Sequence, residues 1–149
     1  MMKLTYDFGG AENPISGRAT VVDKASEKQF RSWGYKNRYI RFNIFKKRLD
    51  VLDADLVYVA RVIRYIDGAS GYLAGDPINR KKYDIITENI WGNVKEGGVV
   101  EFFDHLDVLI PLLENLEMRE MKITQIYVVN PPDEDFCAEW FIRMRKEVK

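Results

Sequence analysis

The sequence has 149 residues, of which 46% are hydrophobic and 31% are charged, and its 23 Lys and Arg balance its 23 Asp and Glu. This composition excludes a disordered chain, and the length suits a single globular domain over residues 1–149. A net charge of zero argues against a bulk nucleic-acid coat protein or a polycationic membrane binder.

The first part of the chain predicts strands. Apolar residues alternate over residues 3–8, which indicates a strand that ends at Gly9 and Gly10. Residues 18–22 predict a second, weaker strand, and residues 38–45 predict a third.

A short helix is predicted between the second and third strands. Ser26 and Gln29 have the spacing of a capping box, which favours a helix start at this point. Gly34 is suited to end the helix. We expect Phe30 and Trp33 to form its buried side.

The middle of the chain is ambiguous. Residues 53–66 fit an amphipathic helix capped by Asp53, but their β-branched residues also fit a strand, so we favour the helix and keep the strand as the alternative. The glycines of residues 68–75 lack the spacing of a phosphate-binding or dinucleotide-binding loop and predict a flexible connection. Apolar residues at helical spacing predict a helix over residues 79–94.

The densest apolar content lies in residues 99–129. Residues 99–117 separate apolar from acidic side chains as an amphipathic helix does, with Pro111 bending it or dividing it in two. Both alternating sets of residues 123–129 are largely apolar, which predicts a strand at the centre of its sheet.

The end of the chain predicts a helix over residues 133–149. Asp133 suits the N-cap, with acidic residues in the first turn and basic residues near the end. We expect its apolar stripe to pack on the preceding strand; the stripe comprises Phe136, Trp140, Phe141, Met144 and Val148.

Together these elements predict an α+β single domain. Its sheet is small and mostly antiparallel, built from the N-terminal strands and residues 122–129, and three to four helices cover it. The only cysteine, Cys137, fits a reducing compartment. Because no apolar run has the length of a membrane span and no signal peptide is visible, we expect a cytoplasmic protein without a membrane partner.

No group of residues has the spacing of a known catalytic or metal site. His105, the only histidine, has no partner facing it on its own predicted helix. Two pairs of aspartates suit magnesium but are better explained by helix capping: Asp53 with Asp55, and Asp133 with Asp135. We therefore predict no catalytic residue, no metal and no cofactor.

Charge is unevenly distributed along the chain. Residues 24–48 hold nine basic residues and one acidic residue, whereas residues 99–136 hold nine acidic and two basic ones. Basic residues interleaved with aromatics can hold phosphates and stack bases. The candidate nucleic-acid-binding residues are Arg31, Trp33, Tyr35, Lys36, Arg38 and Arg41. A solvated strand and helix explain the same pattern.

The acidic face of the predicted helix is the second candidate surface. A carboxylate-rich face can dock a basic protein by resembling phosphate charge and by speeding encounter. The candidate partner-binding residues are Glu101, Asp104, Asp107 and Glu114. A solvated helix surface explains them equally well.

We interpret the chain as a non-enzymatic cytoplasmic binding protein that neutralises or regulates a partner protein. Its most specific form is an immunity-type inhibitor of a toxic nuclease, because the chain is compact, lacks a catalytic constellation and has an acidic face. The alternative is a nucleic-acid-binding module that uses residues 28–48. A third hypothesis is an enzyme that uses carboxylates and a divalent metal.

Overall fold

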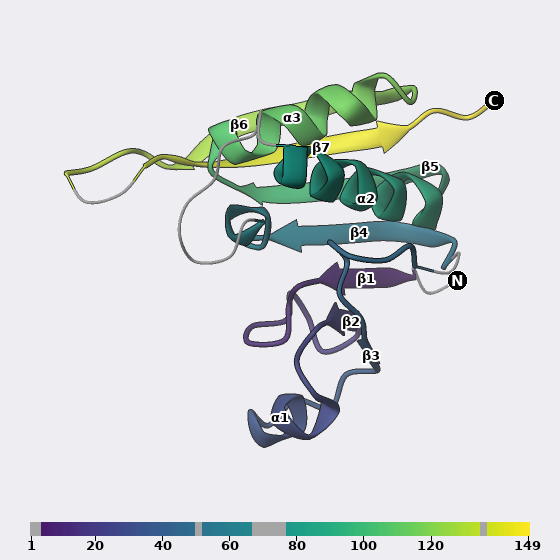
Figure 1. The fold of residues 1–149 in the computed structure, drawn as a ribbon, viewed down its shortest axis with the longest axis vertical. Helices are drawn as coiled ribbons and strands as arrows, with labels where there is room; N and C mark the ends of the chain where they lie inside the picture. The colour runs from purple at the N-terminus through teal and green to yellow at the C-terminus, as the bar shows by residue number, and fades with distance from the viewer. Residues whose placement is uncertain (1–3, 50–51, 67–76, 135–136) are drawn as a thin grey trace.

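One seven-stranded sheet organises the protein. The structure is a computed structural model that describes residues 4–49, 52–66, 77–134 and 137–149. The strands lie in the order β3-β2-β1-β4-β5-β7-β6 (Figure 1). Their bounds are Thr5–Phe8 (β1), Thr20–Asp23 (β2), Tyr39–Arg41 (β3), Ala54–Ala60 (β4), Val94–Asp104 (β5), Met121–Asn130 (β6) and Glu139–Lys146 (β7).

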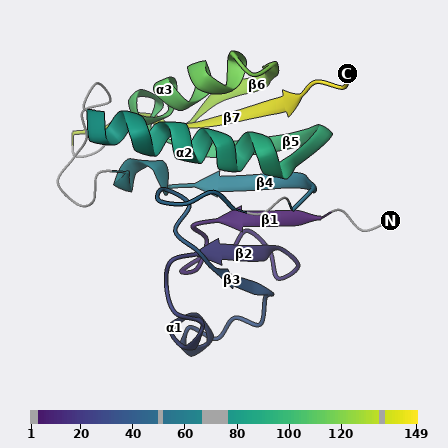
Figure 2. The same cartoon turned by 45° about the vertical axis from the view of Figure 1, so that its right-hand side comes forward.

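The described residues form three α-helices and one short 3-10 helix. These are α1 (Glu27–Ser32), η1 (Ile63–Tyr65), α2 (Pro77–Asn93) and α3 (Leu106–Glu117). Helices α2 and α3 lie on the same face of the sheet (Figures 1 and 2). The main core fills the space between them and the sheet, and its fully buried side chains include Val59, Ile86, Phe102, Leu109 and Ile142. None of the described helices is long and apolar enough to cross a membrane.

The other face of the sheet carries α1 alone among the described helices. Phe30 of α1 packs on Val21 of β2, whereas the adjacent Val22 points into the main core. Residues 9–19, which connect β1 to β2, contain no helix. On this face α1 lies beside β2 and β3 and leaves β4, β5, β7 and β6 without a described helix.

Strand directions make this an α/β fold. Strands β3, β2, β1, β4 and β5 pair in parallel, and β7 is antiparallel to both β5 and β6. Parallel neighbours need a crossover connection, and α1 supplies it between β2 and β3 and α2 between β4 and β5. Helix α3 leads from β5 to β6, which lies beyond β7 in the sheet. The predicted α+β domain with a small, mostly antiparallel sheet is therefore wrong.

The first elements follow the sequence. The first two predicted strands are confirmed as β1 and β2, and the third is shorter than expected. In α1, Ser26 Oγ accepts the N–H of Gln29 at 3.1 Å, as the capping box predicts. Phe30 is fully buried, but Trp33 is 38% exposed at the end of the helix, so its predicted burial is wrong.

The ambiguous middle segment is a strand followed by a 3-10 turn. Residues 54–60 form β4, and the preferred helix is wrong because they pair in parallel with β1 on one side and β5 on the other. Asp53, the expected helix cap, has a left-handed backbone (φ 51°). The helix over residues 79–94 is confirmed as α2. The glycine loop, which includes Gly68, Gly71 and Gly75, lies outside the described residues.

The first part of the predicted helix over residues 99–117 is a strand in the structure. Residues up to Asp104 belong to β5, where Val100 and Phe102 face the core, and α3 begins only after His105. A cluster of Val and Phe residues matches one face of a helix as well as it matches a strand, so periodicity alone gave the wrong boundary. Pro111 lies inside α3.

The C-terminal helix is also wrong. Residues 139–146 form β7, which lies between β5 and β6, so that Ile142 and Met144 are buried while Phe141 lies on the opposite face. Phe136, expected in the apolar stripe, lies outside the described residues. Strand β6, expected at the centre, is at the edge of the sheet.

Candidate functional site

A large cavity opens where the parallel strands end. Its volume is about 1330 Å³, and it is lined by residues that follow β1, β2, β3 and β4. Strand β2 pairs with one side of β1 and β4 pairs with its other side, so the strand order reverses between β1 and β4. In sheets of this kind, ligands bind at the carboxyl ends of the strands, at the point where the strand order reverses.

A glycine turn at the end of β1 forms the floor of the cavity. Gly9 has a left-handed backbone (φ +81°), and a Cβ there would lie 2.5 Å from a methyl group of Val62. A Cβ on Gly10 would lie 2.2 Å from the carboxylate of Asp7. The turn therefore needs glycine at both positions, and it presents bare backbone to the cavity.

The side chain of Asp7 stabilises this turn. Its carboxylate is buried and accepts the N–H of Ile15 at 2.7 Å, which closes the loop over the end of β1. Burial raises the pKa of the Asp7 carboxyl to about 6. The Asp7 side chain is therefore a structural support whose charge costs stability at neutral pH.

Asp23 places a second carboxylate at the end of β2. One oxygen accepts the N–H of Ala11 at 3.1 Å and the other accepts the N–H of Ala25 at 3.2 Å. Because an ionised carboxylate has about four acceptor positions, Asp23 can accept further donors from a ligand in the cavity. An acidic residue at the end of the second strand is the group that binds ribose hydroxyls in dinucleotide folds.

Apolar and aromatic side chains form the other walls. Phe42 and Ile44 follow β3 on one side, whereas Tyr58, Tyr65 and Phe103 belong to the β4–β5 side. Apolar walls around a few placed polar groups are typical of small-molecule sites. In the described part of the chain, no three His, Cys, Asp or Glu side chains lie together in a way that could hold a metal ion.

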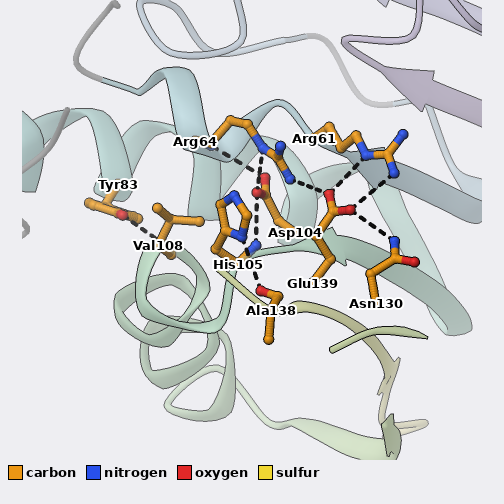
Figure 3. A network of polar contacts seen from close by, with 9 residues as sticks. All are labelled: Arg61, Arg64, Tyr83, Asp104, His105, Val108, Asn130, Ala138 and Glu139. Carbon is orange, nitrogen blue, oxygen red and sulfur yellow. Dashed lines mark hydrogen bonds and ion pairs between the residues drawn. The ribbon is translucent and has the colours of Figure 1, made fainter. Parts of the chain in front are cut away.

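A polar network stabilises the β4–β5 side of the cavity (Figure 3). Arg61 lies over the ring of Phe103, and its guanidinium donates to Glu139. Glu139 also accepts from Arg64 Nη2 at 2.6 Å and from Asn130 Nδ2 at 2.9 Å. These hydrogen bonds, first that of Arg61, lower the pKa of Glu139 to about 2.

The network continues into the core through Asp104. Arg64 Nε donates to the fully buried carboxylate of Asp104 at 2.8 Å. His105, the next residue, donates from Nδ1 to the carbonyl of Ala138 at 3.0 Å. The ends of β4, β5, β6 and β7 are thereby tied together beside the cavity.

The four predicted acidic residues do not share a face. Glu101 and Asp104 lie on β5, and Asp104 is buried against Arg64. Asp107 and Glu114 are exposed on α3. The prediction that these four residues share one helix face is therefore wrong. That the exposed residues bind a protein partner stays a prediction.

The six predicted nucleic-acid-binding residues are also divided. Trp33 and Arg41 line the cavity. Tyr35 stacks on Phe30, with ring centroids 5.6 Å apart. The other three are exposed but do not line the cavity: Arg31, Lys36 and Arg38. Contact with nucleic acid stays a prediction.

Comparison with known proteins identifies the fold. No known protein family matches the sequence, and no curated protein is similar to it. A solved methyltransferase from Methanosarcina mazei, dependent on S-adenosylmethionine (SAM), superposes with a TM-score of 0.74 at 11% identity, over 99% of this chain and 93% of that chain. The fold is that of the SAM-dependent methyltransferases.

Two further structures agree. The N-methyltransferase NodS from Bradyrhizobium japonicum, in complex with S-adenosyl-L-homocysteine, has a TM-score of 0.63 at 15% identity over 97% of this chain and 78% of that chain. A TehB-like SAM-dependent methyltransferase from Corynebacterium glutamicum has a TM-score of 0.66 at 12% identity over 97% and 80%.

This likeness corrects the functional interpretation. A non-enzymatic inhibitor of the immunity type, which neutralises a toxin, is wrong because the shared fold is that of a group of enzymes. The fold also gives no support to the two other hypotheses, a nucleic-acid-binding module and a carboxylate enzyme with a divalent metal. The sequence interpretation did not include Gly9, Gly10 and Asp23, which line the cavity, among its candidate site residues.

Proposed function

We propose that this chain is a SAM-dependent methyltransferase that binds its cofactor in the cavity at the ends of β1, β2 and β4. The observation that carries the proposal is the joint position of the Gly9–Gly10 turn and the Asp23 carboxylate on one cavity, at the reversal point of the sheet. The shared fold with methyltransferases supports it.

The residues present fit the parts of this cofactor. Ribose hydroxyls would donate to Asp23, which already accepts from two backbone N–H groups and has positions left. The apolar side chains of Phe42 and Ile44 suit one side of the adenine ring. The bare backbone of Gly9 and Gly10 would allow the methionine part to approach closely.

The chain's own residues would act mainly by position. When bound, SAM supplies an electrophilic methyl group to a nucleophilic atom of the acceptor. Tyr58, Tyr65 and Phe103 would form the wall against the acceptor and exclude water from it. Glu139 holds Arg61 over the ring of Phe103, so this part of the wall would be in position before the acceptor binds.

Calorimetric titration with S-adenosylhomocysteine tests cofactor binding. We expect the wild type to bind and Asp23→Asn to bind about 10- to 100-fold more weakly, because hydrogen bonds to a charged group contribute about 1.5–3 kcal/mol. The matched control is Asp107→Asn, an exposed carboxylate on α3 outside the cavity, which should bind as the wild type does.

Two outcomes contradict the proposal. The first is a folded wild type that does not bind S-adenosylhomocysteine. The second is an Asp23→Asn variant that binds it as tightly as the wild type. Circular dichroism of each variant establishes that the fold is intact.

We also propose the cytoplasm as the compartment in which the protein works. Cys137 is a free, exposed thiol, which suits a reducing environment. Localisation of a tagged full chain in its host tests this, and recovery from an oxidising compartment would contradict it.

A further inference from the structure

The outer edge of the sheet is unusually apolar. Strand β6 has ten residues, and nine of them are exposed. Its first residue, Met121, is buried, and its other large apolar side chains are between 37% and 47% exposed; they are Ile123, Ile126, Tyr127, Val128 and Val129. Ile126 is opposite the buried Ile142 and Tyr127 is opposite Phe141, so these side chains lie on both faces of the edge strand. Large apolar side chains exposed along one strand in this way mark an interaction site rather than a solvated strand.

The backbone of β6 is open along the same edge. The strand pairs with β7 on its inner side, and no other strand of the described residues pairs with its outer side. An edge strand with free N–H and C=O groups is a template for another strand, and proteins usually protect it with charge, with proline or with bulges. Within β6 the only charged residue is Lys122, and there is no proline.

We infer that β6 is the interface of a homodimer, in which the β6 strands of two copies pair antiparallel about a two-fold axis. A two-fold axis across an edge always gives an antiparallel ladder, so the strand needs no partner other than itself. With the axis near Tyr127, the apolar residues 126–129 of the two copies lie opposite one another.

The charges of the edge favour this self-pairing. The same axis brings the basic start of one strand, Lys122, near the acidic residues that follow the other strand, Asp133 and Glu134. Lys122 is 76% exposed at its side chain and pairs with Glu147, itself exposed, so it can make a second contact. Opposite charges then meet beyond both ends of the paired stretch by symmetry.

Two bulges limit the register. The pairing of β6 with β7 is shifted between Ile123 and Gln125 and again between Val128 and Asn130. Bulges bend a strand and interrupt its ladder, so the regular stretch between them is short. A short regular stretch fits a closed dimer and disfavours a continuous sheet of many copies.

Sedimentation equilibrium of the full chain tests the inference. We expect a dimer for the wild type and at least a tenfold weaker dimer for Val128→Lys, since a charge at the interface must be desolvated. The matched control is Met118→Lys, whose side chain is 84% exposed but lies after α3 rather than on β6. It should dimerise as the wild type does, and thermal melts should show that both variants are folded.

Cysteine scanning distinguishes pairing of the β6 edges from non-specific association of apolar surfaces. With Cys137→Ser as background, single cysteines at positions 124–130 are oxidised, and disulfide-linked dimers are quantified. Self-pairing predicts a maximum at one or two neighbouring positions with a fall on both sides. A monomeric wild type, a Val128→Lys dimer of unchanged strength, larger assemblies, or cross-linking without a maximum would each overturn the inference.

Discussion

The guanidinium of Arg61 meets the carboxylate of Glu139 through two hydrogen bonds, Nε to Oε2 at 2.9 Å and Nη2 to Oε1 at 3.1 Å. Arg61 follows β4 and Glu139 begins β7, and β5 lies between these strands, so the pair bridges across the end of β5. Arg61 also has a left-handed backbone (φ 54°), which is unusual for a residue with a side chain. Glu139 and the ring of Phe103 thus hold a strained residue at the wall of the cavity.

Replacing Glu139 by Gln should destabilise the protein. Glutamine keeps the shape but removes the charge that pairs with Arg61 and Arg64, so the free energy of unfolding should fall by about 1–3 kcal/mol. Urea unfolding at neutral pH measures this. The control is Glu120→Gln, whose exposed pair with Lys149 should contribute no more than about 1 kcal/mol.

The effect of Glu139 should depend on pH. Its pKa is lowered to about 2 in the folded protein, so its stabilisation is complete above the unfolded value of 4.5 and is lost as pH falls from there toward 2. The difference between the wild type and Glu139→Gln should therefore shrink across this range. A difference that stays constant from pH 6 to pH 2 would contradict the role of the charge.

The contribution of Asp7 to stability should change with pH in the opposite direction. Burial raises its pKa from 3.8 to about 6, so the folded state holds the proton more tightly, and the free energy of unfolding falls as pH rises from about 4 to about 6. Asp7→Asn removes this loss and should stabilise the protein above pH 6 by up to about 3 kcal/mol. Chemical melts of both proteins from pH 4 to pH 8 measure it; identical pH profiles would show that the charge is not the cause.

The glycine turn should not accept a side chain. In Gly9→Ala the new methyl group would meet Val62 at 2.5 Å on a left-handed backbone, so we expect a loss of about 1–3 kcal/mol of stability and weaker binding of S-adenosylhomocysteine. Gly17→Ala is the control, because nothing lies within 4 Å of its Cβ position. Equal stability and binding in the two variants would mean that the turn has no special geometry.

Local patterns in the sequence predicted β1, β2 and α1 well. The alternation of β1 and the capping box of α1 depend on neighbouring residues, and both are confirmed. Strand β5 and helix α3 were merged, because Phe102, Phe103 and Leu106 also fit a single helical face. Only the pairing of β5 with β4 and β7 decides that the first two belong to a strand.

The C-terminal strand was missed for a related reason. Acidic residues before Cys137 and basic residues near Lys149 resemble the charge pattern of a helix. In the structure, the basic Arg143 instead pairs across strands with Glu101 of β5, 42 residues earlier. An interaction between residues so distant in the sequence leaves no periodic signal.

The candidate site was hidden because its residues are few. Gly9 and Gly10 were interpreted only as the end of a strand, and Asp23 was not considered. The signal was present in their order: a strand, two glycines, then a second strand that ends in an acidic residue. The segment from residue 9 to residue 19 is short and contains no helix, so the spacing of its glycines did not match a dinucleotide fingerprint.

The structure of the protein crystallised with S-adenosylhomocysteine tests the central claim most directly. The account predicts the ligand in the cavity at the ends of β1, β2 and β4, with its ribose hydroxyls donating to Asp23 and its amino-acid part against the Gly9–Gly10 turn. A ligand bound elsewhere, or a cavity that stays empty at ligand concentrations that saturate other methyltransferases, would contradict it.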